Sequence, residues 1–338
     1  MMTGRERIVK TINYEETDRI PRDVWTTPYI NMFKQTEFDR LTKEFPMDIK
    51  GAEGIWFAKS GREKGEQNRK GKYTDAYGCE WTVLEDGVVG EVKDPIIKTM
   101  ADLDNYKMPW EMIDNANCNN QNDVYKNTDK FVLGHSDVRP YERMQFLMGT
   151  PELMMSMAME EPLFFKLRDM IHDFNKKIIE LVSAQTVDGV NFMDDWGSQN
   201  ALLISPEMWR KYYKPMYKEY CDIIHAKGKY AFFHSDGFIE DIYEDLIEVG
   251  VDVVNSQLFC MDIEKIAEKY AGKITFWGEL DRQHVLPFGT QEDVRMLVKR
   301  IEKTLLSKKK SGFIAQLSWE NITSYENVFA AYDEFNKI

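Results

Sequence analysis

Cysteine is scarce in this chain of 338 residues, and none of its four copies forms a CxxC pair. The four lie far apart, so the sequence lacks the ligand spacing of a zinc finger. We interpret them as the reduced thiols of a cytoplasmic protein, because disulfides are rare in that compartment. The residues are Cys79, Cys118, Cys221 and Cys260.

Long apolar runs and positive charge are scarce too. No stretch approaches 18 uninterrupted apolar residues, and the first seven residues are charged rather than apolar, so we expect neither a transmembrane helix nor a signal peptide. Lysine and arginine number 44 against 57 acidic residues, which gives a formal net charge of −13. The one basic cluster, Lys308-Lys309-Lys310, is typical of a solvated helix end. We therefore expect neither a nucleic-acid nor a membrane partner.

The glycine-rich phosphate-binding motifs of nucleotide-binding sheets, GxGxxG and GxxxxGK[ST], follow none of the predicted strands. What the second half does contain is a repeated unit of one apolar strand followed by one helix. Near-continuous apolar strands are typical of parallel sheets covered on both faces. Five such units in about 150 residues favour a closed (β/α)8 barrel over an open sheet. The predicted strands are 187–193, 229–234, 251–255, 273–277 and 313–316.

The first half is less regular, and we predict that it belongs to the same single domain, residues 1–338. Strands are expected at 20–25 and 131–134, and loops at 61–72 and 115–127. Residues 81–92, with Asp86-Gly87 in the middle, predict a β-hairpin inserted beside the barrel.

Acidic side chains and one imidazole follow three of the predicted strands directly. In α/β barrels the carboxyl ends of the strands carry the chemistry, so these side chains predict an enzyme site. His234 and Asp236 are alternate residues that would face one side, as metal ligands or as an acid/base pair; a helix cap beside a core histidine is the structural alternative. We predict His234, Asp236 and Glu279 as metal ligands, and Asp194, Asp195 and Asp281 as catalytic acids.

Of the adjacent pair Asp194 and Asp195, one is expected to cap or bond backbone while the other faces the pocket. Aromatic and polar residues near the strand ends are predicted to bind substrate, although packing at the rim or a structural ion pair would also place them there. They are Trp25, Trp196, Trp277, Gln316 and Arg22.

At this point several segments, taken in order, resemble the uroporphyrinogen decarboxylase superfamily, which includes cobalamin-dependent methyltransferases. The resemblance covers nearly the whole chain and implies a single (β/α)8 barrel, often dimeric, with its pocket at the carboxyl ends of the strands. It is carried by Thr3-Gly4-Arg5-Glu6-Arg7, Asp18-Arg19-Ile20-Pro21, Leu202-Leu203-Ile204-Ser205-Pro206, His234-Ser235-Asp236-Gly237, Leu246-Ile247-Glu248-Val249-Gly250-Val251-Asp252, Gly278-Glu279-Leu280-Asp281 and Tyr325-Glu326-Asn327-Val328.

Two departures from true decarboxylases leave the chain closer to the methyltransferase branch. True decarboxylases carry an arginine-containing segment after the first strand, where this chain has Trp25-Thr26-Thr27-Pro28-Tyr29, and a late histidine segment, where it has Gln316-Leu317-Ser318-Trp319. In the methyltransferase branch a His-x-Cys pair and a later cysteine bind zinc. Here His234 matches, Asp236 replaces the first cysteine, and Leu317 or a neighbour stands at the second. A histidine–carboxylate set would favour an oxygen substrate, a different metal or no metal.

Three functions stay open on the sequence alone. The first is a methyltransferase, with zinc as its metal, that acts on a small substrate and uses a corrinoid carried by a separate protein, as the resemblance implies. The second is a metal-free decarboxylase or lyase acting on a small or porphyrin-like carboxylic acid, which arginines converging on the pocket would favour. The third is a ligand-binding barrel without catalysis, which a pocket plugged by aromatic side chains would favour. The resemblance also implies a homodimer.

Overall fold

The computed structural model describes residues 2–52, 57–118, 121–306 and 311–338. Eight parallel strands form a nearly closed barrel with helices between them, as predicted. Their order around the barrel is β1-β11-β10-β9-β8-β7-β6-β2. They are β1 (Arg22–Thr26), β2 (Ile49–Gly51), β6 (Phe131–His135), β7 (Gly189–Met193), β8 (Tyr230–Ser235), β9 (Val253–Ser256), β10 (Thr275–Trp277) and β11 (Phe313–Trp319).

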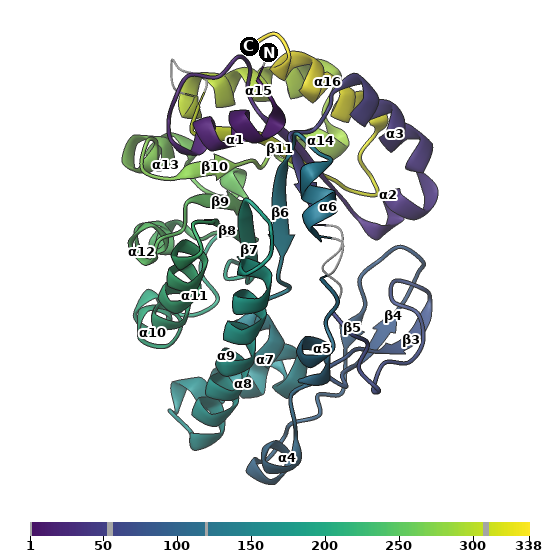
Figure 1. Ribbon diagram of the computed structural model, residues 1–338, viewed down its shortest axis with the longest axis vertical. Coiled ribbons are helices and arrows are strands. Elements are labelled where there is room, and N and C mark those ends of the chain that lie inside the picture. Colours follow the sequence, from purple (N-terminus) through teal and green to yellow (C-terminus); the bar gives the residue numbers. More distant parts are fainter. Residues whose placement is uncertain (1, 53–56, 119–120, 307–310) are drawn as a thin grey trace.

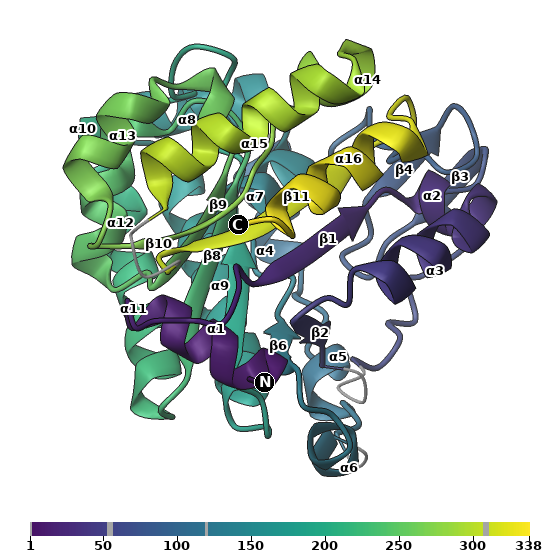
Figure 2. The same cartoon turned by 90° about the horizontal axis from the view of Figure 1, so that it is seen from above.

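Helices cover the outside of the barrel, and several begin where the sequence supplies a cap. Thr3 and Glu6 form a capping box on α1, and Ser205 and Ser324 each accept from a backbone amide of the first turn that they cap. Figure 2 shows α16 lying over β11 and β1. The helices of the first half are α1 (Gly4–Ile12), α2 (Pro28–Phe33), α3 (Gln35–Glu44), α4 (Met100–Asn105), α5 (Glu111–Asp114), α6 (Gln121–Lys126), α7 (Pro140–Met148), α8 (Thr150–Ala158) and α9 (Pro162–Ser183).

The helices of the second half follow the strand–helix repeat. Pro215 lies in the first turn of α11, so the helix predicted from Ser205 onward is divided into α10 and α11 at Tyr213. The elements are α10 (Pro206–Tyr212), α11 (Lys214–Ala226), η1 (Glu240–Ile242), α12 (Tyr243–Val249), η2 (Leu258–Cys260), α13 (Ile263–Tyr270), α14 (Val285–Phe288), α15 (Gln291–Leu305) and α16 (Tyr325–Phe335). The basic cluster 308–310 lies outside the described residues.

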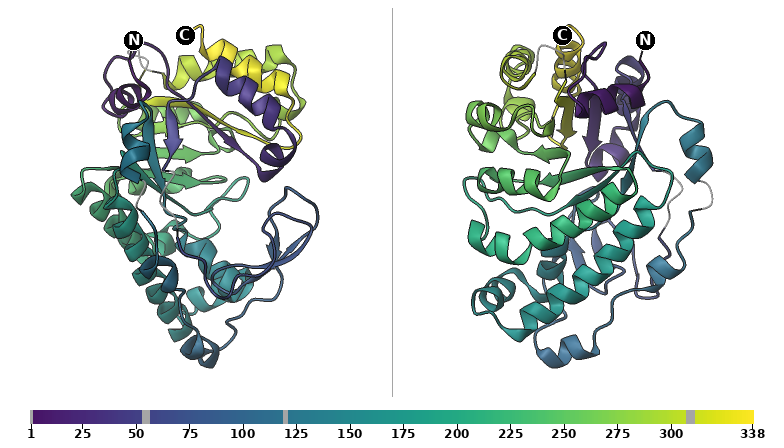
Figure 3. Two further views of the ribbon diagram at one scale, coloured as in Figure 1. Left: turned by 45° about the vertical axis from the view of Figure 1, so that its right-hand side comes forward. Right: turned by 60° about the vertical axis from the view of Figure 1, so that its left-hand side comes forward.

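The predicted hairpin is present as part of a separate antiparallel sheet of three strands. Its strands β4 (Glu80–Val83) and β5 (Glu91–Val92) pair as expected, and β3 (Gly71–Thr74) extends the sheet into the segment that we predicted as loop. A second predicted loop contains α6. Figures 1 and 3 show the small sheet beside α5, on the side of the molecule away from α12 and α13.

The interior of the barrel changes character along its axis. One end is apolar: Ile8 and Ile12 of α1 pack with Phe131, Phe232 and Trp277 in one buried cluster. Backbone hydrogen bonds hold α1 at this end of the barrel. In one of them the amide of Gly312, the residue before β11, donates to the Thr11 carbonyl at 3.2 Å. Inward positions further along the strands carry polar side chains instead, among them Asn191 and Asn255. The barrel is therefore plugged at one end and polar toward the other.

The circle of strands is incomplete between β1 and β2. Within the described residues these two strands share no ladder of hydrogen bonds. Asp48, just before β2, bridges the gap: its amide donates to the Arg22 carbonyl at 2.9 Å, and its Oδ2 accepts from the Arg22 amide at 2.8 Å. The Asp48 carboxylate is buried and pairs with Arg7 and with Arg19, the latter at 2.7 Å. None of the helices in the described part of the chain is both long and apolar enough to cross a membrane.

Candidate active site at the carboxyl ends of the strands

The loops after β7 and β8 meet at two glycines. A Cβ on Gly197 would lie 2.2 Å from the Phe238 nitrogen, and one on Gly237 would lie 2.1 Å from the Gly197 carbonyl oxygen. Gly237 also has a positive φ of 77°, which favours glycine. Because neither residue carries a side chain, the two backbones lie against each other, and the Gly197 amide donates to the Asp236 carbonyl at 3.1 Å.

This close approach brings three predicted site residues together. The His234 Nε2 lies 3.6 Å from the nearest oxygen of Asp195 and 3.6 Å from that of Asp236. One ligand atom from each of the three falls within 4.8 Å of the others, which is close enough for a shared metal ion. Asp195 and Asp236 remain partly exposed, with 42% and 32% of each side chain accessible. The group, called here the DHD cluster, is therefore open to the solvent.

The adjacent aspartates after β7 have opposite environments. Asp194 is buried and accepts hydrogen bonds from the amides of Tyr141 and Glu142, both at 2.9 Å, in the first turn of α7. It also accepts from the Tyr217 hydroxyl at 2.8 Å. Burial raises the pKa of Asp194 to about 7. Asp194 thus holds α7 and α11 against β7, while Asp195 faces the cluster, as expected for one member of the pair.

His234 is held by neighbours on either side. The Trp25 ring packs against the imidazole with ring centroids 5.0 Å apart. On the other side Nδ1 lies 2.6 Å from Asn255 Oδ1. Asn255 in turn donates to the Trp277 carbonyl and, at 3.0 Å, to Gln316 Oε1. The Gln316 amide nitrogen is buried with no hydrogen-bond partner among the described residues, so the predicted substrate ligand keeps a free donor.

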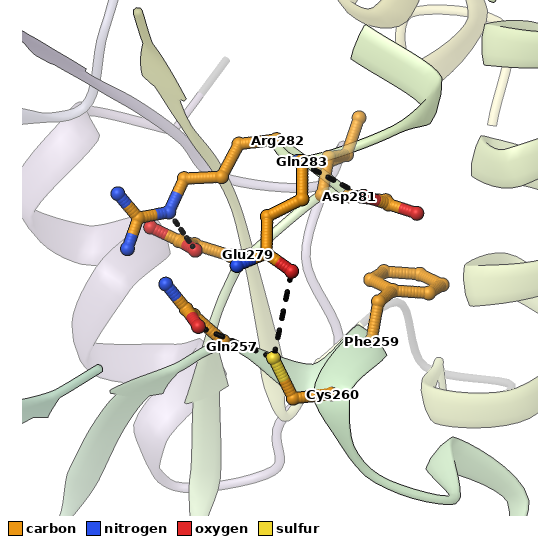
Figure 4. A pocket seen from close by; sticks show the side chains of 8 residues that line it. Gln257, Phe259, Cys260, Glu279, Asp281, Arg282 and Gln283 are labelled. Carbon is orange, nitrogen blue, oxygen red and sulfur yellow. Dashed lines mark hydrogen bonds and ion pairs between the residues drawn. The ribbon is translucent and has the colours of Figure 1, made fainter. Parts of the chain in front are cut away.

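Arg282 connects the DHD cluster to two further acids. Its guanidinium pairs with Asp236, with Glu279 Oε2 at 3.0 Å and with Glu320 Oε1 at 3.2 Å. Figure 4 shows Arg282 extending over Glu279. The side chain is only 18% exposed, so these contacts lie where charges are weakly screened. Arg282 is the positive charge that balances this acidic region.

Glu279 and Asp281, both predicted in the site, lie outside the DHD cluster. Burial raises the pKa of Glu279 to about 8 although Arg282 lies beside it. Asp281 Oδ1 accepts from the amides of Gln283 and His284, at 3.0 and 2.8 Å, and so stabilises the turn into α14. In Figure 4 its carboxylate points away from Arg282. The structure therefore places Asp195, and not Glu279, as the third member of the candidate metal site.

Trp25 and Trp277, two predicted substrate ligands, line a cavity of about 540 Å³ that also touches Asp23 and His135. Their rings meet edge to face with centroids 4.9 Å apart. Asp23 Oδ2 accepts from Trp277 Nε1 at 3.0 Å, and burial raises the pKa of Asp23 to about 6. The cavity lies where β1 and β2 separate, and Trp25, which lines it, also contacts His234.

The other two predicted substrate ligands lie elsewhere, which corrects their placement. Arg22 is buried on the outer side of β1, where it contacts Asn336 and the Phe45 ring. Trp196 is buried among helices, stacked on Tyr141 at 4.3 Å. Arg22 begins β1 and so lies at its amino end, and Trp196 lies in the loop after β7 with its ring against Tyr141 of α7.

Three residues of the region were missed by the sequence analysis: Asp23, Asn255 and Arg282. Asp23 shares the inward face of β1 with Trp25, and Asn255 is the inward residue two positions after Val253, so alternation along each strand was the available signal. Arg282 follows Asp281 directly and had no periodic signal, because it lies in a turn.

The chain matches the family described as uroporphyrinogen decarboxylase (URO-D) over residues 73–333. The protein belongs to the URO-D family. A search of curated proteins found no sequence match.

Among solved structures, a methyltransferase from Methanosarcina mazei is similar to this URO-D family protein over 100% of its length and 99% of that chain, with a TM-score of 0.70 and 13% identity. An endo-beta-1,4-xylanase from Gloeophyllum trabeum aligns over 96% and 99% of the two chains with a TM-score of 0.43 and 10% identity. At such identities the first likeness establishes a shared fold, and the second carries no argument.

Proposed function

We propose that this URO-D family protein is a methyltransferase that binds a divalent metal ion at Asp195, His234 and Asp236. It would move a methyl group between a small substrate and a corrinoid carried by a separate protein. The observation that carries the proposal is the convergence of three potential ligand atoms within 4.8 Å at the open end of the barrel. The methyltransferase fold of the Methanosarcina mazei neighbour supports it.

The donor set fits a divalent ion. One imidazole nitrogen and two carboxylate oxygens are ligand types that zinc accepts, and they also suit harder divalent metals. The cluster has no thiolate, so this set differs from the His-x-Cys arrangement that the family resemblance implies. A bound ion would act as a Lewis acid on a heteroatom of the substrate. With two carboxylate ligands we expect that heteroatom to be oxygen.

The neighbouring residues would bind and orient the substrate. Trp25 and Trp277 form an aromatic wall beside His234, and their cavity is of a size that suits a small molecule. The free amide of Gln316 offers a hydrogen-bond donor. In the metal-free protein Arg282 would limit the repulsion between Asp236 and Glu320.

The alternatives have less support from the geometry. A decarboxylase of polycarboxylates requires free positive charge, but the guanidinium that contacts the DHD cluster is already paired with three acids. A non-catalytic barrel would have its mouth blocked by aromatic side chains. Instead the acids of the cluster are partly exposed.

The first test is metal content and zinc binding. Protein purified from zinc-replete culture would be analysed by mass spectrometry, and metal-free protein titrated with zinc sulfate by calorimetry. We expect near-stoichiometric zinc that falls at least tenfold in affinity in Asp195→Ala, His234→Ala and Asp236→Ala. Asp222→Ala, which removes an exposed acid of α11, serves as the matched control and should bind zinc normally.

The second test is methyl transfer. Methylcobalamin would be mixed with the zinc-loaded protein and panels of small alcohols, phenols and thiols, and its demethylation followed by absorbance. We expect demethylation that depends on the protein and on His234. Wild-type protein that binds no zinc and demethylates nothing would contradict the proposal and favour the decarboxylase.

The proposal includes a homodimer located in the cytoplasm. Light scattering coupled to size-exclusion chromatography tests the first point directly. A single species with the 39.7 kDa mass of one chain at micromolar concentration would contradict the dimer.

A further inference from the structure

Asn255 has a hydrogen bond on both sides of its carboxamide. The residue is completely buried in β9. Its Nδ2 donates to the Trp277 carbonyl and to Gln316 Oε1, the latter at 3.0 Å, while its Oδ1 lies 2.6 Å from His234 Nδ1. A fully engaged amide of this kind has one orientation available to it.

The Trp277 contact decides that orientation. A backbone carbonyl can only accept, so the atom facing it must be the amide nitrogen of Asn255. The opposite atom, which faces His234, is therefore the oxygen. An amide oxygen also only accepts, so Nδ1 of His234 must carry a hydrogen and donate it.

We propose that Asn255 is a positioning residue that holds neutral His234 in the tautomer protonated on Nδ1. The lone pair of His234 is then on Nε2, the nitrogen that lies 3.6 Å from both Asp195 and Asp236. Which ring nitrogen binds a metal is set by the hydrogen bond of the other. Asn255 thus prepares His234 as a ligand before any ion arrives. This consequence rests on the proposed function; the tautomer itself does not.

A second pair in the same barrel provides a matched control. Asn191 Oδ1 on β7 lies 3.1 Å from His135 Nδ1 on β6, and His135 is not part of the DHD cluster. The Asn191 amide nitrogen has no partner among the described residues, so its orientation is not fixed in the same way. Asn191→Leu makes the same chemical change as Asn255→Leu, next to the other imidazole.

Nitrogen NMR of histidine-labelled, metal-free protein reads the tautomer directly. The chain has five histidines, and His234→Gln assigns the resonance in question. We expect a protonated Nδ1 and an unprotonated Nε2 for His234 at a pH where the ring is neutral. Asn255→Leu should abolish this preference and weaken zinc binding by roughly 10–100-fold. Asn191→Leu should change neither.

The outcomes separate this inference from the proposed function. A wild-type His234 protonated on Nε2 overturns the inference, even if Asn255→Leu fails to fold. A folded Asn255→Leu with unchanged tautomer and unchanged zinc affinity overturns it too. If wild-type protein shows the expected tautomer, and loses it in Asn255→Leu, but binds no zinc, the inference stands and the metal-dependent function fails.

Discussion

The backbone amide of Asp236 donates to Asp195 Oδ1 at 2.9 Å, so the acid of one loop is oriented by the backbone of the next. The same oxygen lies 3.6 Å from His234 Nε2. The loops after β7 and β8 therefore position the DHD cluster as one unit, and a change in either loop is expected to disturb both carboxylates.

Gly197→Ala tests this coupling. The added methyl group would meet the Phe238 nitrogen at 2.2 Å, a contact that backbone atoms can relieve only by moving apart. We expect the loops to separate, with a fall of several degrees in Tm and a loss of zinc affinity of at least tenfold. Gly61→Ala is the control, because nothing lies within 4 Å of its added methyl group. Normal zinc binding by Gly197→Ala would show that the glycine contact does not shape the site.

Asp194→Ala and Asp195→Ala should affect different properties although the residues are adjacent: the first should lower stability and the second should weaken zinc binding. Asp194→Ala leaves two amides of α7 and the Tyr217 hydroxyl without their acceptor, so we expect a loss of about 2 kcal/mol or more in the free energy of unfolding. Asp195→Ala should leave stability nearly unchanged and weaken zinc binding. Urea denaturation and zinc titration of both variants measure the contrast. Equal stability of the two variants would contradict the structural role of Asp194.

Glu279→Gln should flatten the dependence of stability on pH. The folded pKa of Glu279 is about 8, above its ordinary value of 4.5. Its contribution to stability is therefore complete below pH 4.5 and is lost as the pH rises toward 8, because only the unfolded chain ionises readily there. The loss is at most about 1.4 kcal/mol for each unit of pKa shift.

Thermal unfolding of wild type and Glu279→Gln between pH 5 and 8.5 provides the measurement. We expect the wild-type Tm to fall relative to that of the variant as the pH rises. Glu326→Gln replaces an exposed acid of α16 and should follow the wild-type curve. Parallel curves for wild type and Glu279→Gln would rule out a raised pKa at this position.

Arg282→Gln should make the metal-free protein less stable and its zinc affinity higher. The variant leaves Glu279 and Glu320 without their guanidinium, and it frees Asp236 from a competing cation. We expect a lower Tm without metal, a larger rise in Tm on adding zinc, and a several-fold gain in affinity. Arg300→Gln, which breaks an exposed pair with Glu264, should change neither quantity. A weaker zinc affinity in Arg282→Gln would mean that Arg282 supports the site rather than competing for it.

The sequence was sufficient to predict the barrel because its strands are apolar and its helices are capped locally. Ser205, Ser324 and the Thr3–Glu6 pair make the expected capping contacts. Short elements were not predicted, because they are too short to show a periodic pattern; β2, for example, has three residues. The segment leading to β3 is charged and rich in glycine, and the strand β3 forms by pairing with β4 and, at Thr74, with Lys64.

The candidate site could be predicted only as far as the strand ends. His234, Asp195 and Asp236 were predicted in the site because each lies at the end of an apolar strand or just after it. The placement of Arg22 failed because it is the first residue of β1, at the amino end of the strand, and because its side chain faces the Phe45 ring while Asp23 turns inward. Glu279 was predicted as a metal ligand because it also follows an apolar strand. Its ion pair with Arg282 could not be predicted, because Arg282 lies in a turn, which has no periodic sequence pattern.

The missing ladder between β1 and β2 in the described residues gives this barrel a property that a closed one lacks. A ladder that runs all the way around makes each strand depend on two neighbours, whereas β1 and β2 each have one ladder partner in the described residues. Opening should then begin at this seam, and amide hydrogens of β1 and β2 should exchange with solvent sooner than those of β8, which has a ladder on both sides. The cavity beside Trp25 lies between β1 and β2, so separation of these two strands would also widen access to the site.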